Sequence, residues 1–141
     1  MDILSLIITV SFVLLGVLHF YWAAGGKAGI HKVIPTIDGK PSIEPGKIIT
    51  VLVAAVLIGI AAVSYLLGFV KLGEVPYGKY IVYVGWLLSA VFVARSVGDF
   101  NLVGFFKKHK TSEFAVYDTK YYSPFCALVS AGFVALSYSQ A

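Results

Sequence analysis

Few side chains in this sequence are suited to acid–base or ligand chemistry, and those that are gather at the ends of long apolar runs. They are His19 and Trp22 near the end of the first run, Arg95 and Asp99 at the end of the third, and Asp118, Tyr121 and Tyr122 at the start of the fourth. Imidazole titrates near neutrality, and arginine binds carboxylates and phosphates through a planar fork of N–H donors. The candidate ligand-binding residues are therefore His19, Trp22, Arg95, Asp99, Asp118 and Tyr121.

The spacing of these residues predicts two local pairs. Arg95 and Asp99 are four apart, so their charged groups meet on one face if the helix continues through Gly98. Arg95 is then either a structural pair and topology anchor, or a group that faces a site between helices and binds an anion or headgroup. His19 and Trp22 are three apart and share a helix face. His19 is either a hydrogen-bonded interior histidine or a proton carrier or ligand contact.

Other kinds of site find no support in the sequence. The three histidines have no metal-ligand spacing, and the single cysteine, Cys126, lies on another span. Nucleophile motifs and phosphate-cradling glycine loops are missing. Asp99 and Asp118 form an acid–base pair only if the connecting loop folds back, and Asp118 is as easily a cap or a loop charge. We therefore predict no metal and no cofactor, and we lean against an enzyme.

The composition places these groups in a membrane. Hydrophobic residues make up 59% of the 141 and charged residues only 13%, and the mean hydropathy is +0.88. A soluble domain of this size needs a charged shell, whereas the charges here are confined to short stretches between apolar runs. The net charge of +4 belongs to loops beside anionic headgroups rather than to a nucleic-acid-binding face.

Four apolar runs are long enough, or nearly so, to cross about 30 Å of hydrocarbon. They predict spans over residues 3–24, 48–70, 80–97 and 122–139. The fold class is therefore an all-α bundle of four transmembrane helices in a single integral membrane domain. Ser123 is expected to cap the fourth helix with Pro124 at its first position. The alternative is that Pro124 lies within a longer, kinked helix.

The basic residues predict the orientation of the spans. Eight lysines lie in the two long connections: Lys27, Lys32, Lys40, Lys47, Lys107, Lys108, Lys110 and Lys120. Only Lys71 and Lys79 lie on the other side, so both termini are expected outside the cytoplasm. Within the first connection, Asp38-Gly39 between short β-prone runs predicts a small β-hairpin. The second mixes phenylalanine with lysine, which suits a segment in the headgroup region.

Small residues at a spacing of four are expected to mark the inward faces of the helices. They are Ala55 with Gly59, Ser64 with Gly68, Gly85 with Ser89, and Ala127 with Ala131. The aromatic residues Tyr77, Tyr80, Tyr83 and Trp86 at one end of the third span are expected to anchor it at the membrane interface.

The sequence also resembles a known family at these residues. The resemblance lies in Leu18-His19-Phe20-Tyr21-Trp22-Ala23 with Gly25-Gly26, in Ala94-Arg95-Ser96-Val97-Gly98-Asp99-Phe100 with Gly104 and Lys107, and in Phe114, Asp118 and Tyr122-Ser123-Pro124. In these stretches the chain is similar to a bacterial family of small four-span membrane proteins, domain of unknown function 3995. The resemblance implies a membrane fold and a bacterial source, and it implies no activity, cofactor or partner.

Three hypotheses of function follow. The first is a non-catalytic protein of the bacterial inner membrane that holds a small anionic ligand, a lipid headgroup or a protein partner in a cleft between spans one, three and four. The second is a membrane-embedded enzyme or proton-coupled carrier that uses His19, Asp99 and Asp118. The third is an accessory subunit of a larger membrane complex. The expected partners are membrane lipids and another membrane protein, with no nucleic acid.

Overall fold

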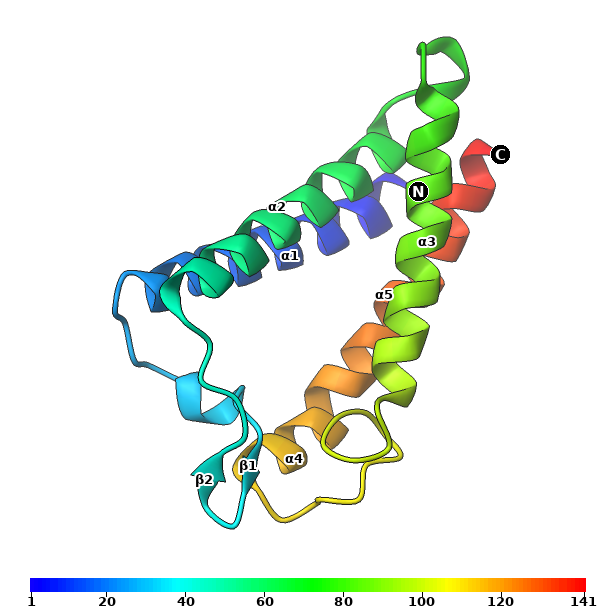
Figure 1. Ribbon diagram of the computed structural model, residues 1–141. Coiled ribbons are helices and arrows are strands. Elements are labelled where there is room, and N and C mark those ends of the chain that lie inside the picture. Colours follow the sequence, from blue (N-terminus) through cyan, green and yellow to red (C-terminus); the bar gives the residue numbers. More distant parts are fainter.

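The computed structural model describes all 141 residues and is almost entirely helical (Figure 1). In chain order the elements are α1 (Asp2–Ala23), the 3₁₀ turn η1 (Ile30–Lys32), β1 (Thr36–Ile37), β2 (Lys40–Pro41), α2 (Lys47–Phe69), the 3₁₀ turn η2 (Leu72–Glu74), α3 (Gly78–Val97), α4 (Glu113–Tyr117), the π-helical turn η3 (Asp118–Tyr122) and α5 (Ser123–Gln140). Four helical segments are long and apolar enough to cross a membrane, the last running from Glu113 to Gln140. The fold therefore agrees with a multi-pass membrane protein.

Bulky apolar side chains cover the outside of these helices. Ile48 on α2 is 77% exposed and Leu128 on α5 is 73% exposed, and many others on all four helices are open in the same way. In water such a surface would be a large aggregation hazard. It suits a chain whose surrounding solvent is hydrocarbon, where only the backbone and the few polar groups need partners within the protein.

The four helices pack as two pairs, α1 with α2 and α3 with α5. Figure 1 shows that the pairs meet at the end that carries both termini and diverge toward the other end, where the two long connections lie. The shared core, which includes Ile8, Phe12, Leu67, Phe133 and Leu136, joins the two pairs. The predicted bundle is therefore correct in its four helices, but these helices do not remain together along their whole length.

Serine hydroxyls fasten each pair internally. Ser5 Oγ donates to the carbonyl oxygen of Ser64 at 2.7 Å, and Ser64 Oγ donates to that of Ser5 at 3.2 Å. In the other pair, Ser130 Oγ donates to the carbonyl oxygen of Ser89 at 2.9 Å and lies 3.1 Å from Ser89 Oγ. Each such bond in a membrane is worth about 0.6 to 2 kcal/mol, so both pairs are fixed in register by the same chemistry.

The last turn of α5 ties the two pairs together at the terminal end. The Gln140 amide nitrogen donates to the carbonyl oxygens of Leu67 and Val70, each at 2.9 Å, and its oxygen accepts from the Leu72 N–H at 3.2 Å. Carbonyl groups at the end of α2 have no helical partner of their own. One amide side chain therefore caps α2 and holds the turn that leads into α3.

The small-residue spacing predicts two of the four inward faces correctly. Ser64 and Gly68 lie against α1, and Gly85 and Ser89 are buried against α5. The prediction is wrong for Ala55 with Gly59 and for Ala127 with Ala131, all of which are exposed. Small residues permit close approach but do not by themselves decide which face a partner covers. On α5 the inward face is instead marked by Cys126, Ser130 and Ser137.

The predicted hairpin is confirmed. Thr36 pairs with Pro41 and Ile37 with Lys40 in an antiparallel arrangement. Asp38 and Gly39 both have positive φ, at 51° and 76°, as a type I′ turn requires.

The expected start of the fourth helix is wrong in one respect. Ser123 does not cap a helix, because the helix already begins at Glu113 and passes through the π-helical turn η3 into α5. The Ser123 N–H bonds to the carbonyl oxygen of Asp118 five residues back, just before Pro124, which has no N–H to donate. The alternative, a longer helix that contains Pro124, is the arrangement observed, and Ser112 is the cap that accepts the Ala115 N–H at 3.0 Å.

The contact between α1 and α2 leads to a test of helix packing. A Cβ added at Gly68 would overlap the Ser5 side chain, whereas no atom lies within 4 Å of a Cβ added at Gly59 on the same helix. We therefore expect Gly68→Val to lower the free energy of unfolding by about 1 to 3 kcal/mol, the usual cost of overpacking. The matched variant Gly59→Val should change it little. Thermal or SDS-induced unfolding in detergent measures both, and equal effects would contradict the packing described.

Candidate functional site

A buried carboxylate, that of Asp118, lies at the centre of the polar groups. Its Oδ1 accepts from Arg95 Nη2 at 2.9 Å and from Ser123 Oγ at 3.3 Å. Its Oδ2 accepts from Lys107 Nζ at 2.9 Å and from the Gly104 N–H at 2.8 Å. The Asp118 side chain is fully buried. We call these five residues the Asp118 cluster.

Lys107 is as deeply buried as the carboxylate that it contacts. Its Nζ donates to the Gly104 carbonyl at 2.8 Å, to Asp118 at 2.9 Å and to Thr119 Oγ1 at 2.6 Å. These three acceptors match the three N–H donors of an ammonium group. Lysine is almost never fully buried unless it is paired. Here the Lys107 ammonium and the Asp118 carboxylate would each be costly to bury alone, and each compensates the charge of the other.

The loop between α3 and α4 carries Lys107 inward because two glycines let it cross itself. Gly98 and Gly104 have φ of +90° and +88°, and a Cβ on either would overlap the backbone of the other segment. Asp99 fixes the turn that follows: its Oδ1 accepts from the N–H groups of Asn101, Leu102 and Val103 at 2.8 to 3.0 Å. These backbone bonds, led by that from Asn101, lower the pKa of Asp99 below its usual 3.8.

The predicted pair between Arg95 and Asp99 does not form. Helix α3 ends at Val97, and Gly98 turns the chain away before Asp99 can continue the helical face. Arg95 bonds instead to Asp118, which lies 23 residues further along the chain. The loop folds back as the acid–base alternative required, but the two carboxylates have separate tasks, since Asp99 caps the loop and Asp118 pairs with Lys107 and Arg95.

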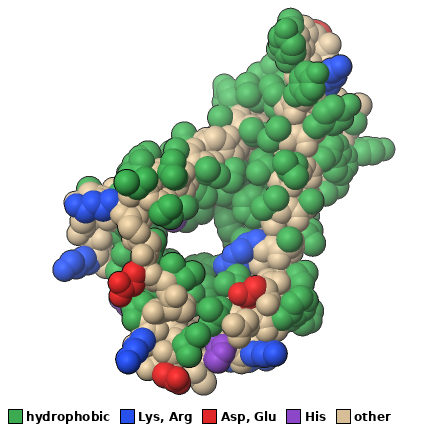
Figure 2. Space-filling model, viewed as in Figure 1, with side chains coloured by type: hydrophobic (Ala, Val, Ile, Leu, Met, Phe, Trp, Pro, Cys, Tyr) green, Lys and Arg blue, Asp and Glu red, His purple; other side chains and the backbone are tan.

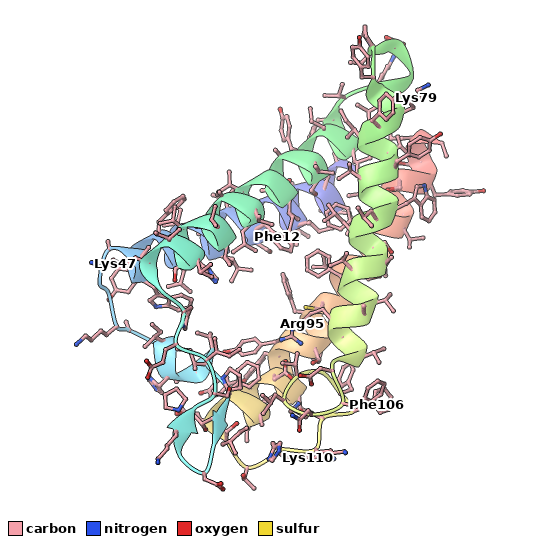
Figure 3. All side chains as sticks on the ribbon, in the orientation of Figure 1. Phe12, Lys47, Lys79, Arg95, Phe106 and Lys110 are labelled. Atoms are coloured by element: carbon pink, nitrogen blue, oxygen red, sulfur yellow. The ribbon has the colours of Figure 1, made fainter.

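The Asp118 cluster has an excess of positive charge. It contains the cations of Arg95 and Lys107 and the single carboxylate of Asp118. The Arg95 side chain as a whole is 32% exposed, but its Nη1 atom is buried and has no hydrogen-bond partner, whereas Nη2 is paired with Asp118. Figure 3 shows Arg95 extending from α3 into the space between the two helix pairs. One half of the guanidinium fork is therefore a buried donor without an acceptor in the protein.

The space between the pairs is open through the molecule. Figure 2 shows the opening, with a basic group on its margin and apolar side chains around much of the remainder. At the loop end the opening is closed by η1 and α4, which contact each other. His31 Nε2 lies 3.6 Å from Glu113 Oε2, Lys32 Nζ lies 5.1 Å from the centre of the Tyr117 ring, and the Tyr122 hydroxyl donates to the Lys32 carbonyl at 3.1 Å.

His19 and Trp22 lie together, as their spacing predicts, but in a pocket apart from the Asp118 cluster. Their ring centres are 4.9 Å apart. His19 Nδ1 is 2.8 Å from the Leu15 carbonyl oxygen, and Trp22 Nε1 donates to the Ala28 carbonyl at 2.8 Å. They line a pocket of about 370 Å³ between the end of α1, η1 and the start of α2, with Glu44 and Lys47 also on its wall.

Tyr121 occupies a third position. It is 50% exposed and its ring lies 5.7 Å from that of Tyr117 and 5.1 Å from Lys120 Nζ. The six candidate residues therefore divide between the Asp118 cluster, the pocket beside His19, the loop cap at Asp99 and the outer surface at Tyr121. No three His, Cys, Asp or Glu side chains come together in a group that could hold a metal ion.

Sequence reasoning missed the role of Lys107. The sequence indicates only a loop charge and a residue of the family resemblance, because lysine among phenylalanines is typical of a headgroup-facing segment. The available signal was the pair of glycines at 98 and 104, which indicates a tight crossing near an arginine. The two glycines do not predict that Lys107 lies close to Asp118.

Comparison with known proteins defines the class to which this fold and site belong. The family model described as "Protein of unknown function (DUF3995)" matches residues 12–133. The chain belongs to this family, as the resemblance indicated, and the match covers all the residues of the Asp118 cluster. The searches of curated proteins and of solved structures found no match.

The ion pairs lead to a stability test. Asp118→Asn removes the only carboxylate that neutralises Lys107, so we expect a loss of about 3 to 5 kcal/mol in the free energy of unfolding. Adding Lys107→Met to that variant should restore part of the loss, because the buried cation is removed as well. Unfolding in detergent of the wild type, both single variants and the double variant measures the coupling. Strict additivity of the two substitutions would show that the pair is not formed.

Proposed function

We propose that this chain is a non-catalytic protein of the bacterial inner membrane that binds an anionic group at the loop end of the opening between its helix pairs. The observation that carries the proposal is the Arg95 guanidinium, paired with Asp118 through Nη2 while Nη1 has no acceptor. An arginine within an apolar span is costly and is typical of a binding or transport site.

The charge of the cluster favours an anion. Asp118 offsets the charge of one of the two cations, the buried Lys107 or the partly exposed Arg95, and the other charge remains uncompensated. A phosphate or carboxylate bound at Nη1 would supply the missing negative charge and a charge-assisted hydrogen bond, which is among the stronger kinds in proteins. The anion would not displace Asp118, because the two ligands occupy different nitrogens of the same guanidinium.

The location of the cluster favours a group at the cytoplasmic face. Both long connections, with their eight lysines, lie at the end where the helix pairs diverge. By the excess of positive charge that end is cytoplasmic, and both termini are then outside. Anionic headgroups and cytosolic anions both reach this depth.

The contacts of the carboxylates disfavour the alternative of an enzyme or proton-coupled carrier. Asp99 is occupied by three backbone N–H groups, and both oxygens of Asp118 are held by cations and other donors. His19 bonds to its own helix rather than to either carboxylate. The third alternative, an accessory subunit, would show itself as a stoichiometric partner in mild-detergent purification.

Arg95→Gln tests the proposed binding. Glutamine keeps a donor for Asp118 but loses the positive charge, so we expect retention of anionic phospholipid or of added inorganic phosphate to fall by roughly tenfold or more. Native mass spectrometry and lipid analysis of the purified full chain measure retention. Lys79→Gln, at the opposite end of α3, is the matched control and should have no effect. Unchanged retention in a folded Arg95→Gln protein would refute the proposal.

The orientation is tested independently of binding. Reporter fusions at residue 1 and residue 141 should both be active only outside the cytoplasm, because the lysine-rich connections remain inside. A phosphatase reporter and a fluorescent protein, which respond to opposite sides, give the readout. A cytoplasmic signal at either end would place the Asp118 cluster on the wrong side for a cytosolic anion.

A further inference from the structure

An apolar groove lies on the outside of the molecule between α1 and α5. It has a volume of about 620 Å³, and its walls include Leu14 and Leu18 from α1 and Phe125 and Leu128 from α5. Leu14 is 64% exposed and Leu128 is 73% exposed, so the groove opens sideways into the surrounding hydrocarbon. Its size lies within the range of about 300 to 1,000 Å³ that is usual for ligand pockets.

The loop end of this groove is chemically different from the remainder. Lys120 and Tyr121 form that end, with the ammonium group 5.1 Å from the ring centre. No carboxylate pairs with Lys120, since the ion pairs of the molecule are those of His31, Lys71, Arg95 and Lys107. The groove is therefore apolar along its length and has an uncompensated positive charge at one end.

This end belongs to the same π-helical turn, η3, that carries Asp118. A group bound beside Lys120 thus lies at about the membrane depth of the Asp118 cluster, and at the end where the positively charged connections gather. A lipid with a phosphate at that depth would extend its acyl chain toward the terminal end, along the leucines of α1 and α5. The groove therefore runs in the same direction as a phospholipid in a bilayer, with the charged end at the loops and the apolar length toward the termini.

We infer that the groove holds one acyl chain of an anionic phospholipid whose phosphate lies beside Lys120. The inference rests on the proposed function only for its choice of an anionic ligand, and it goes beyond that proposal by assigning a second site, beside Lys120, to a lipid that enters from the bilayer. Charge complementarity selects the anionic headgroup, and the sideways opening selects a chain that is already in the membrane. A chain that is already in the bilayer gains no hydrophobic transfer energy on entering the groove, so its preference for the groove depends on packing against the side chains that line it and on the charge of Lys120.

Photolabelling of the full chain in nanodiscs tests this assignment. The probe is phosphatidylglycerol with a diazirine in one acyl chain, and phosphatidylcholine with the same chain is the zwitterionic comparison. Peptide mapping should find the label concentrated on residues 14–18 and 121–128, and more from phosphatidylglycerol than from phosphatidylcholine. Label spread evenly over all four helices, or equal labelling by the two lipids, would overturn the inference.

Filling the groove provides the matched variants. Leu14→Trp combined with Leu128→Trp should lower labelling by roughly tenfold, because bulky rings occupy the space of several methylenes. Both positions face the bilayer, so folding should be unaffected. Leu6→Trp, also exposed on α1 and outside the groove, should leave labelling unchanged. Undiminished labelling in the filled variant would overturn the assignment of the groove.

Two further variants separate this inference from the proposed function. Lys120→Gln should remove the preference for phosphatidylglycerol while leaving the label in place, and a preference that persists would overturn the role of Lys120. If Arg95→Gln alone lowers anion retention and the filled groove does not, the proposed function stands and the acyl groove fails. If the label depends on the groove and on Lys120 but is indifferent to Arg95, the groove stands and the Arg95 site fails.

Discussion

The structure depends on one carboxylate, that of Asp118, held away from water between two cations. An ionised group in a low-dielectric setting is tolerated only when charge and hydrogen bonds compensate it. Asp118 obtains this compensation from Arg95 on α3, Lys107 in the loop and a backbone N–H at Gly104. One side chain therefore determines how the end of α3, the following loop and the start of the fourth helical segment are arranged.

The same cluster connects the architecture to the proposed binding site. Serine hydrogen bonds hold each helix pair together internally. The two pairs share an apolar core only near the termini, and they diverge toward the loops (Figure 1). The divergence leaves Arg95 beside an opening instead of inside a closed bundle. At this margin Arg95 is paired with Asp118 and its side chain is about one-third exposed, which is the arrangement on which the proposed anion binding rests.

Sequence patterns predicted the elements better than the contacts between them. Apolar runs define helices because length and hydropathy act locally, and Asp38-Gly39 defines a turn because positive φ is a property of those two residues. The partner of Arg95 is not local. A spacing of four favoured Asp99, but one glycine at position 98 ends the helix and redirects the chain toward Asp118. Likewise, Ala55 and Ala127 are small but face outward, since a neighbouring helix decides which face is covered.

Burial of Lys107 makes the structural role of Asp118 compatible with the proposed binding of an anion. Ordering a lysine side chain costs about 2 kcal/mol of rotamer entropy, and a loop charge that served only as a topology anchor would remain in water. Because Lys107 neutralises Oδ2 of Asp118, the carboxylate does not depend on Arg95 alone. Arg95 uses only Nη2 for its contact with Asp118, and Nη1 has no acceptor within the protein. Because Lys107 shares the neutralisation of Asp118, Arg95 does not have to direct all of its donors at that carboxylate.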